Sequence, residues 1–570
     1  MKKKILFRCD GGAIPEIGTG HVVRCLALAK GLIQEPGTQV AFATRSDAQI
    51  AEMIRQAAYP CYEIKEDEPA GMVQALQEFK PDIVVLDLLK TAPGLMELIK
   101  KNGAILIALD EYGNTRDIAD FLINPIIPNA DALYQGFDYM VFPHTLISKQ
   151  PISDSKTRVF ASFGGYDHED LSRKVLEKLM PLPDSIHLDV VVGRLYPRIQ
   201  ELRKAFEKKG SVEIHQNPAN YQELISKSKI AIVSGGLTLF EAAAAGIPCI
   251  VVPQYEHQQK NGKRIEELGA GICLKDSREA LVELPQILNH LIQTPDLYRR
   301  IEKRGRQLFD GLGNKRVSDL IGVIRYLDWD SQFFRVKIAY LAPKRIRESI
   351  LKFAFLKCEE ESVECLYYLC DCHDSESVRL AERNGFHFTD IRLTFERDIA
   401  DWKPLNTRGP SEIVIRECLP EDLKMIQKIA EDNYQHSRYY FDHHFSKEIC
   451  QKFYSDWVSK SSRGEFDDLV FVVSSDRKII GFICCKRVSN NLGRIGLIGV
   501  DRQRQAQGVG IGLVEKACEW FHNQGILRVE VVTQGRNLPA QKFYQKCGFQ
   551  IARSEIWYHK WFQKNYRAEF

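Results

Sequence analysis

A glycine-rich turn near the amino terminus places a histidine where it could act as a base. The apolar run Lys4–Phe7 is typical of a buried strand, and it leads through Asp10 to Gly18-Thr-Gly20-His21. Glycines let the backbone approach a ligand, and free N–H groups at a helix N-terminus attract anions. His21 begins the following helix and carries an imidazole that exchanges protons near neutral pH. An alternative of equal weight is that the segment Gly18–His21 is only a tight strand-to-helix turn without a catalytic role.

A second strand, glycine loop and helix lies in the middle of the chain. After the strand Ile230–Val233 come Gly235 and Gly236, then Thr238 and, one turn into the helix, Glu241. Backbone amides and hydroxyls at such a turn cradle a diphosphate. A carboxylate one turn further on can accept hydrogen bonds from both ribose hydroxyls of a nucleotide.

The polar segment after the next strand is rich in amide side chains. It runs from Gln254 to Asn261 and includes Gln258. Amides suit sugar hydroxyls, so Gln258 and Asn261 are candidate substrate contacts. A polar surface turn is the equal alternative.

A third glycine motif lies near the carboxyl terminus. The strand Leu497–Val500 is followed by Gln505-Ala-Gln-Gly508-Val-Gly510 and a helix. Amides of such a loop point into one hollow and bind a pyrophosphate. We expect glycine at positions 508 and 510 because a Cβ would fill that hollow.

A second element follows this loop: the strand Val529–Thr533 and the motif Asn537-x-x-Ala-x-x-Phe-Tyr544-x-x-x-Gly-Phe. The combination resembles the GNAT N-acetyltransferases, which use acetyl-CoA. The resemblance implies that Tyr544 protonates the departing thiolate and that Asn537 holds the CoA arm. An N–H of the strand around Val500 would stabilise the oxyanion, and Gln505 replaces the commoner arginine. Tyr544 as a core aromatic is the alternative.

The elements that position these motifs alternate between strand and helix. Continuous apolar runs joined by helices are typical of parallel sheets covered on both faces. Two successive doubly wound halves predict a cleft beyond the carboxyl ends of the strands. Strands are expected at Lys4–Phe7, Val40–Thr44, Ile83–Leu86, Ala104–Leu109, Arg158–Ser162, Leu188–Val192, Ile230–Val233 and Pro248–Val252, and helices at His21–Leu32, Gly94–Lys101 and Leu239–Ala245.

Composition excludes several classes of protein. The 570 residues are 44% apolar and 27% charged, with 78 basic against 75 acidic side chains. This balance argues against nucleic acid or a membrane surface as partner. Without an apolar run of about 18 residues, and with fifteen cysteines spread along the chain, we expect a cytoplasmic protein with reduced thiols. Cys370-Asp-Cys-His373 lacks a second ligand pair, so no metal is expected.

Residues 1–305 resemble the nucleotide-sugar hydrolases of pseudaminic acid biosynthesis, in the wider GT-B class of glycosyltransferase-like folds. Members of this family remove UDP from a 2,4-diacetamido-2,4,6-trideoxy sugar, with water as nucleophile, inversion at the anomeric carbon and no metal. The resemblance implies that His21 is the base, that Glu241 contacts the ribose, and that Asn261 contacts sugar or phosphate. The matching stretches are Arg8–Asp10, Ile17–Leu28, Asp110-Glu111, Asn124-Pro125, Ser162–Gly165 and Ser234–Glu241 through Asn261.

One departure from that family concerns the sugar. Where the third strand of the family commonly ends in Asp-His-Tyr, this chain has Asp87-Leu88-Leu89. Two polar sugar contacts are missing, which puts the identity of the sugar in question more than the class of reaction. The spore-coat polysaccharide relatives of the hydrolase are an alternative family to which this part of the chain could belong.

The section before the GNAT motifs has a resemblance of its own. Leu327–Phe334, Ser377–Phe386 and Ile391–Arg397 resemble the N-terminal part of the dTDP-4-amino-sugar acetyltransferase family. There the helix-Gly-Phe motif survives and the Gln-x-x-Gly-x-Gly loop does not, which predicts a degenerate half-module packed on the active one. The expected domains are therefore a GT-B-like pair at 1–150 and 151–322, a GNAT-like half-module at 323–400, a linker at 401–412, and the GNAT domain at 413–570.

These inferences predict a bifunctional α/β enzyme. One module acetylates the amine of a nucleotide-linked 4-amino sugar with acetyl-CoA, and the other hydrolyses the nucleotide from the product. Two alternatives stay open: a GT-B glycosyltransferase fused to an acetyltransferase, and a binding protein with one inactive module.

Overall fold

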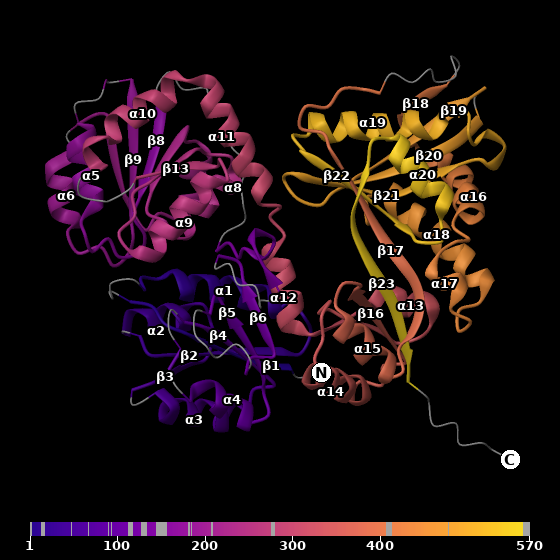
Figure 1. Cartoon of the computed structure of the whole chain (residues 1–570), viewed down its shortest axis with the longest axis horizontal. Coiled ribbons are helices and arrows are strands. Elements are labelled where there is room, and N and C mark those ends of the chain that lie inside the picture. The colour runs from indigo at the N-terminus through magenta and orange to yellow at the C-terminus, as the bar shows by residue number, and fades with distance from the viewer. Residues whose placement is uncertain are drawn as a thin grey trace. The chain divides into compact units, whose positions relative to one another are not determined.

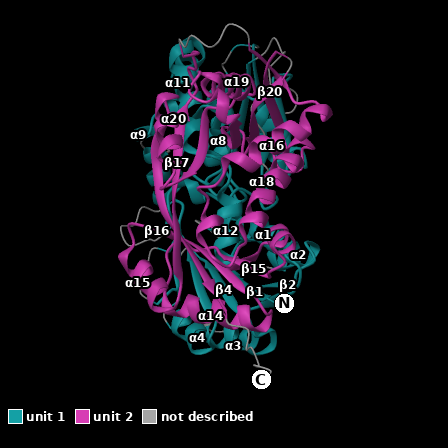
Figure 2. Cartoon of the chain, turned by 90° about the vertical axis from the view of Figure 1, so that its right-hand side faces the viewer, with its two compact units in different colours: residues 1–321 teal, residues 322–570 magenta. Residues whose placement is uncertain are grey.

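The computed structural model forms two compact units, residues 1–321 and 322–570 (Figures 1 and 2). It describes residues 3–12, 17–46, 48–65, 68–88, 91–92, 94–111, 118–126, 134–143, 157–180, 183, 185–206, 209–274, 280–405, 413–476 and 478–562. Among these residues, none of the helices is both long and apolar enough to cross a bilayer.

The first sheet of unit 1 is parallel and doubly wound, as the sequence predicts. Its order is β3-β2-β1-β4-β5-β6-β7, so the strand order reverses between β1 and β4. Ligands of such sheets bind at this reversal, beyond the carboxyl ends of the strands. The elements are β1 Lys3–Cys9, α1 Gly20–Leu32, β2 Thr38–Thr44, α2 Ala48–Gln56, β3 Cys61–Glu63, α3 Glu68–Phe79, β4 Ile83–Asp87, α4 Leu95–Lys101, β5 Ile105–Leu109, β6 Phe121–Asn124, β7 Tyr134–Gln135 and the short 3-10 helix η1 Phe137–Tyr139.

The second sheet repeats this design in the order β10-β9-β8-β11-β12-β13, again with parallel strands. Both of its faces are packed with aliphatic side chains, which explains the continuous apolar runs in the sequence. The elements are β8 Thr157–Ser162, α5 Leu171–Leu179, β9 Ile186–Val192, α6 Ile199–Phe206, β10 Val212–Gln216, α7 Tyr221–Ser226, β11 Ile230–Val233, α8 Leu237–Ala245, β12 Cys249–Val251, α9 Glu256–Glu267, β13 Gly271–Cys273, η2 Ala280–Val282, α10 Leu284–Gln293 and α11 Pro295–Leu308.

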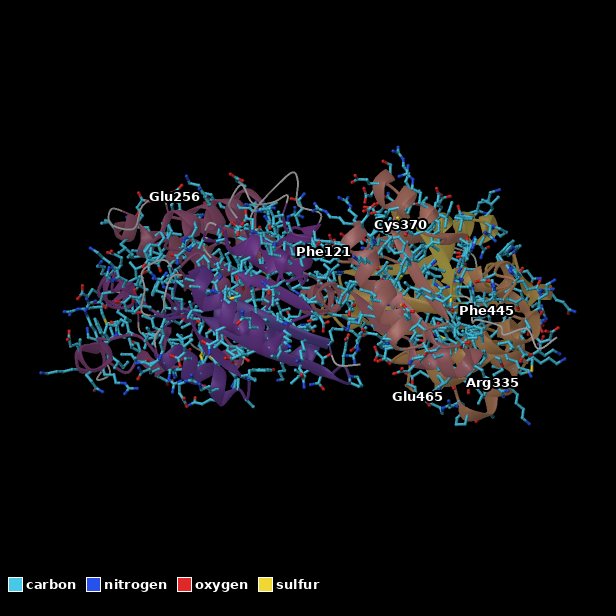
Figure 3. The ribbon with its side chains drawn as sticks, turned by 90° about the horizontal axis from the view of Figure 1, so that it is seen from below. Phe121, Glu256, Arg335, Cys370, Phe445 and Glu465 are labelled. Atoms are coloured by element: carbon cyan, nitrogen blue, oxygen red, sulfur yellow. The ribbon has the colours of Figure 1, made fainter. Side chains whose placement is uncertain are left out.

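Side chains drawn on the ribbon show where these layers meet solvent. Figure 3 places Glu256, the first residue of α9, at the outer edge of unit 1, and its side chain is 82% exposed. Phe121 of β6 is fully buried in the first sheet.

The last helix of unit 1 packs against the segment that follows the first sheet and η1. In α12 (Gly313–Gly322), Asn314 accepts a hydrogen bond from the Phe142 N–H and donates one to the Phe142 carbonyl, both at 2.8 Å. The backbone beside Met140 lies so close that a Cβ on Gly313 would come within 1.9 Å of the Met140 oxygen. This close approach ties the end of the second domain to the first.

Unit 2 is built on one sheet of ten strands, in the order β14-β15-β16-β23-β17-β22-β21-β20-β19-β18. The long strands β17 and β23 run side by side through its centre (Figure 1). The elements are β14 Ile324–Tyr326, α13 Asp328–Phe334, β15 Ile338–Leu341, α14 Glu348–Glu360, β16 Cys365–Asp371, α15 Ser375–Arg383, β17 His387–Asp398, β18 Val414–Glu417, η3 Pro420–Asp422, α16 Leu423–Asn433, α17 Arg438–Phe441, α18 Lys447–Ser462, β19 Leu469–Ser475, β20 Lys478–Arg487, β21 Leu492–Val500, η4 Arg502–Arg504, α19 Val509–Asn523, β22 Arg528–Gln534, α20 Leu538–Lys546 and β23 Gln550–Trp561.

This topology corrects one expectation about residues 323–400. We expected a half-module packed on residues 413–570, but β17 of that segment hydrogen-bonds β22 on one side and β23 on the other. The two segments therefore share one continuous sheet. Most of the expected linker, residues 406–412, lies outside the described residues.

The predicted strands and helices of unit 1 are confirmed to within two residues at most ends. In unit 2, β21 begins at Leu492, five residues before the predicted start at Leu497. Gly493 and Gly496 interrupt the apolar pattern there, because each lies against a buried side chain that leaves no room for a Cβ.

The contact between α12 and the backbone of Phe142 predicts a stability effect. Asn314→Ala leaves the N–H and carbonyl of buried Phe142 without their partner, so unfolding of unit 1 should become easier by about 1–3 kcal/mol. Calorimetry of the full chain measures the shift. Lys315→Ala removes only an exposed pair with Asp319 and should change stability by less than about 0.5 kcal/mol. Equal shifts in the two variants would contradict the role of Asn314.

Candidate active sites

Unit 1 contains a cleft of about 680 Å³ lined by the loops after the carboxyl ends of both parallel sheets. It is the cleft expected from two doubly wound halves. Nearly all residues that the sequence singled out in this unit line it: Gly18, Gly20, His21, Gly235, Gly236, Thr238, Glu241, Gln258 and Asn261.

Asp10 is not among the residues that line the cleft. Its carboxylate accepts two hydrogen bonds from the guanidinium of Arg8, at 2.5 and 2.9 Å, and one from the Arg45 backbone N–H at 2.7 Å. Arg8 is fully buried, so Asp10 supplies the countercharge that its burial requires. This geometry gives Asp10 a structural task behind the site.

His21 at the start of α1 is oriented by a buried carboxylate. Its Nδ1 lies 2.7 Å from Oδ1 of Asp87, the last residue of β4. An ionised carboxylate only accepts hydrogen bonds, so the Nδ1 of His21 carries the proton and Nε2 is the basic nitrogen. The histidine side chain is 19% exposed and lines the cleft, where Nε2 can take a proton from a bound molecule.

The ionised state of Asp87 follows from its neighbours. Burial by itself would raise the pKa of Asp87, but the charge of Arg24, the interaction with His21 and hydrogen bonds from both outweigh burial and lower that pKa. Arg24 donates from Nε to Asp87 at 2.8 Å and also pairs with Asp110. One guanidinium thus connects the carboxylates at the ends of β4 and β5 behind the histidine.

The second half of the cleft is shaped by backbone approach. A Cβ on Gly235 would lie 2.1 Å from the carbonyl oxygen of Gln258, so only glycine fits there. Asn261 donates from Nδ2 to the Gly235 carbonyl at 2.8 Å, and Gln258 accepts from the Gln254 N–H at 2.9 Å. These amides hold the turn that presents the N-terminus of α8 to the cleft.

Glu241 is a buried carboxyl group at the wall of the cleft. The Tyr221 hydroxyl lies 3.2 Å from Oε2, and Gln222 donates to Oε1 at 3.3 Å. Burial raises the pKa of Glu241 to about 8, although both hydrogen bonds act in the opposite direction. At neutral pH the group is mainly protonated, and donors such as two ribose hydroxyls would favour its ionised form.

The unusual Asp87-Leu88-Leu89 sequence makes part of the cleft wall apolar. Leu88 is 5% exposed and lines the cleft, whereas Leu89 lies outside the described residues.

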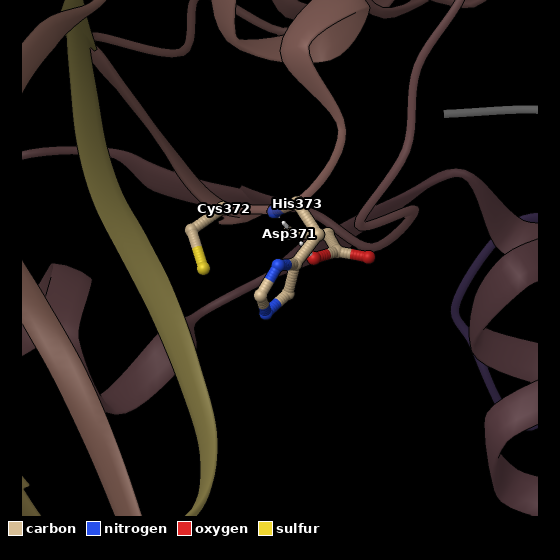
Figure 4. Close-up of side chains that lie close together, drawn as sticks. All are labelled: Asp371, Cys372 and His373. Atoms are coloured by element: carbon tan, nitrogen blue, oxygen red, sulfur yellow. Dashed lines mark hydrogen bonds between the residues drawn. The ribbon is translucent and has the colours of Figure 1, made fainter.

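The cysteine-rich turn after β16 brings three potential ligand atoms within 4.8 Å of one another, from Asp371, Cys372 and His373 (Figure 4). Asp371 also accepts from the backbone N–H of His373 and from the guanidinium of Arg345, both at 3.0 Å. The three ligand atoms come from one turn, whereas zinc prefers about four ligands. We therefore assign no metal site to this cluster.

In unit 2, the strands β21 and β22 diverge beside the third glycine motif. Their parallel ladder ends at Ile495 and Val531, although β21 continues to Val500. Alternate peptide groups point to opposite edges of a strand, and Asp501 donates to Ile480 of β20. The N–H of Val500 therefore points toward the opening between β21 and β22, where it can donate to a bound carbonyl or oxyanion.

Two side chains hold the carbonyl of Val500 at this opening. Gln505 and Asn433 each donate a side-chain N–H to the Val500 oxygen at 3.2 Å, and Gln505 also donates to Asn433 at 3.1 Å. In the described geometry, Gln505 thus fixes the end of β21.

The two glycines of the loop have different roles. Gly508 precedes α19 with a φ of 84°, a left-handed conformation that favours glycine. At Gly510 a Cβ would lie 3.0 Å from the ring of Phe543, a tight contact that the ring could relieve only by shifting. The pyrophosphate hollow expected at this glycine stays a prediction.

The motif around Tyr544 forms α20. Asn537 caps this helix by accepting from the Ala540 N–H at 3.2 Å. Tyr544 is 5% exposed, with its ring 5.8 Å from Phe395 and 6.1 Å from Phe549. Burial raises the pKa of Tyr544, which keeps the phenol protonated. The ring is thus part of the core, and its hydroxyl remains a candidate acid.

Three residues of these sites receive no role from the sequence: Asp87, Tyr221 and Asn433. Asp87 and Asn433 are each the last residue of a strand or helix, and Tyr221 is the first residue of a helix. Many residues hold such positions, so position alone does not identify a site residue. Their partners His21, Glu241 and Val500 are 66, 20 and 67 positions away, which no local pattern reveals.

The raised pKa of Glu241 predicts a pH effect on stability. Between the ordinary carboxyl pKa of 4.5 and the folded value of about 8, the folded state holds a proton that the unfolded state has released. Raising the pH through this range should therefore destabilise unit 1. Glu241→Gln mimics the protonated acid and should flatten the decline in unfolding temperature from pH 5 to 8. Glu267→Gln, on the exposed surface of α9, should leave the decline unchanged. Parallel profiles for Glu241→Gln and the unaltered chain would contradict the assignment.

Comparisons with known proteins match the two units to different families. Residues 162–312 match the glycosyltransferase family 28 C-terminal domain, and residues 425–549 match the acetyltransferase (GNAT) family. The chain spans 57% of the length of the Methanocaldococcus jannaschii protein MJ1062, to which it is 29% identical over 283 residues.

Three named relatives each match a part of this chain. The spore coat polysaccharide biosynthesis protein SpsG of Bacillus subtilis is 28% identical over 55% of this chain and 96% of its own length. The UDP-2,4-diacetamido-2,4,6-trideoxy-beta-L-altropyranose hydrolase of Campylobacter jejuni is 23% identical over 42% of this chain and 87% of its own. The dTDP-fucosamine acetyltransferase of Escherichia coli is 23% identical over 28% of this chain and 66% of its own.

Fold, site and comparisons agree on the two parts of the molecule. The chain joins a unit of two parallel, doubly wound sheets, the second of which matches the glycosyltransferase family 28 C-terminal domain, to a C-terminal unit that matches the acetyltransferase (GNAT) family.

Proposed function

We propose that unit 1 hydrolyses a UDP-linked 2,4-diacetamido-trideoxy sugar and that unit 2 acetylates the amine of a nucleotide-linked 4-amino sugar. The observation that carries the first activity is the hydrogen bond from His21 Nδ1 to Asp87, which leaves Nε2 as a base at the cleft. The resemblance of unit 1 to the altropyranose hydrolase supports this choice of substrate.

The proposed hydrolysis uses both halves of the cleft. His21 takes a proton from water as the oxygen attacks the anomeric carbon, and the bond from that carbon to the diphosphate oxygen breaks. The leaving UDP carries the negative charge, which the N-terminus of α8 and the amides around Gly235 and Gly236 stabilise. Glu241 accepts hydrogen bonds from the ribose. No metal enters this scheme.

The proposed acetyl transfer uses the opening between β21 and β22. The neutral amine of the sugar attacks the thioester carbonyl of acetyl-CoA, and the oxyanion accepts a hydrogen bond from the Val500 N–H. The C–S bond then breaks, and Tyr544 donates its proton to the thiolate of CoA. The amine loses a proton to solvent, so the products are an amide and free CoA. The relation to the dTDP-fucosamine acetyltransferase supports an amino-sugar nucleotide as acceptor.

Glycosyl transfer is the second candidate for unit 1. It is favoured by the match of residues 162–312 to glycosyltransferase family 28 and by the apolar Leu88 in the cleft wall. In that case a sugar hydroxyl replaces water as the nucleophile activated by His21.

One experiment distinguishes these reactions. The full chain is incubated with UDP- and dTDP-linked 4-amino sugars and acetyl-CoA in water enriched in ¹⁸O, and products are identified by mass spectrometry. Hydrolysis at the anomeric carbon places one ¹⁸O in the free sugar and none in the released nucleotide. An acetylated nucleotide sugar that persists until an acceptor is added would favour transfer and overturn the hydrolase assignment.

The histidine–aspartate pair predicts a selective loss. His21→Ala removes the base, and Asp87→Asn removes the acceptor that holds the Nδ1 proton, so each should slow nucleotide release by about 10²–10⁴. Acetyl transfer by unit 2 should remain normal and serves as the control for folding. Glu256→Gln, an exposed position outside the cleft lining, should retain nucleotide release. Normal release in His21→Ala would reject the assignment of the base.

Removal of the Tyr544 hydroxyl tests the acid of unit 2. Tyr544→Phe keeps the packed ring, so acetyl-CoA binding should be unchanged while kcat for acetylation falls by about 10²–10⁴. Steady-state kinetics and calorimetric titration with acetyl-CoA separate the two effects. Tyr558→Phe, which alters another buried tyrosine of unit 2, on β23, should leave kcat unchanged. A normal kcat in Tyr544→Phe would return this residue to a purely structural role.

A further inference from the structure

Four potential metal ligands gather on one face of two neighbouring strands in unit 1. His187 and Asp189 lie on β9, and Glu213 and His215 lie on the edge strand β10. Glu213 is the register partner of Asp189, and residues two positions apart share a face of a strand. All four side chains therefore project from the same face, which further along β9 packs through Val191 against α7 and α8.

Each of the two imidazoles, of His187 and His215, faces both carboxylates with its Nε2 atom. The Nε2 of His187 lies 3.6 Å from Oδ1 of Asp189 and 3.7 Å from Oε1 of Glu213. The Nε2 of His215 lies 3.3 Å from Oδ1 of Asp189 and 3.7 Å from Oε2 of Glu213. The other oxygen of Asp189 accepts from the guanidinium of Arg158 at 2.7 Å.

His187 supplies an independent observation. Its side chain is 9% exposed, and its Nε2 is buried without a hydrogen bond to any of the described residues. A buried nitrogen without a partner is costly, and native proteins rarely retain one without a reason. The atom faces both carboxylates at distances too long for a hydrogen bond, so a binding partner that fits between them would satisfy it.

Ligand atoms of His187, Asp189 and Glu213 all lie within 4.8 Å of one another, and the Nε2 of His215 approaches the same two carboxylates, Glu213 through its other oxygen. The spacings from the imidazoles to the carboxylates are close to the edges of a tetrahedral metal site. Zinc binds histidine nitrogen at about 2.0–2.1 Å and carboxylate oxygen at about 2.0–2.2 Å, so ligand atoms around one tetrahedral ion are roughly 3.3–3.5 Å apart. Imidazole and carboxylate together suit zinc among the divalent transition metals. Arg158 is placed as the outer partner that orients a ligating carboxylate.

We propose that His187, Asp189, Glu213 and His215 bind one zinc ion in a closed tetrahedral site. Four protein ligands leave no position for a substrate, which is the arrangement of structural zinc. The ion would join the edge strand β10 to β9 and so fasten the sheet that carries Gly235 and Glu241. This site is separate from the cleft, because none of its four ligands lines the cleft.

Zinc binding by the full chain tests the proposal. Protein treated with a chelator is dialysed against zinc, and bound metal is measured by mass spectrometry and by competition with a zinc indicator. We expect one zinc ion per chain, and we expect its binding to require the four proposed ligands on β9 and β10. Glu213→Gln and His215→Gln, at partly exposed positions that spare the core, should each weaken binding beyond the about 10–100-fold that loss of an outer partner costs. Cobalt substitution should give the intense visible absorption of tetrahedral Co²⁺, and both variants should reduce it.

Matched variants identify the source of any zinc that binds. His290→Gln alters an exposed histidine of the same domain, and Cys372→Ser alters the cluster after β16; neither should affect the strand site. The proposal is overturned if the unaltered chain retains no zinc, or if Glu213→Gln and His215→Gln bind it as tightly as the unaltered chain. It is equally overturned if Cys372→Ser alone removes the bound metal.

Discussion

The buried carboxylate of Asp87 is the interaction on which the cleft of unit 1 depends. It ends β4 at the point where the strand order reverses, and it is fully buried between Arg24 and His21 of α1. A buried charge is tolerated only when it is paired and hydrogen-bonded. The same pairing that satisfies Asp87 therefore anchors the start of α1 and orients His21 at the cleft. The contacts that stabilise the fold around Asp87 are thus the same contacts that orient His21.

Close backbone approach provides the second constraint on that cleft. A Cβ on Gly165 would lie 2.3 Å from the hydroxyl oxygen of Thr19, and one on Gly193 would lie 2.3 Å from the Gly165 carbonyl. Gly165, Gly193 and Gly235 line the same cleft as Gly236, which caps the N-terminus of α8. Main-chain amides bind anionic oxygens but make no contact that distinguishes one sugar from another. They therefore suit a diphosphate group that many substrates have in common. Under the proposed function, selection among sugars would fall to side chains that line the cleft, such as Leu88.

The candidate site of unit 2 is built from segments far apart in sequence. The opening beside Val500 exists because β22 leaves β21 after Ile495, and β22 is held on its other side by β17 from residues 387–398. The segment that lacks a glycine loop of its own thus contributes a central strand to the sheet that carries the loop. Its aromatic side chains extend the same core, where Phe334 packs against Phe445 and Phe453. The acetyltransferase unit is consequently residues 322–570 and not the last part alone.

Local patterns in the sequence determined the strands, the glycine turns and the placement of His21 and Glu241 beside them, because burial on both faces and left-handed or crowded backbone leave direct marks on residue choice. The pairing of His21 with Asp87, of Glu241 with Tyr221 and of Val500 with Asn433 was decided only by the tertiary structure. So were the insertion of β17 between β22 and β23 and the meeting of His187 with Glu213. Which strands become neighbours depends on the free energy of the whole sheet, and buried strands carry nearly the same apolar pattern whatever their neighbour.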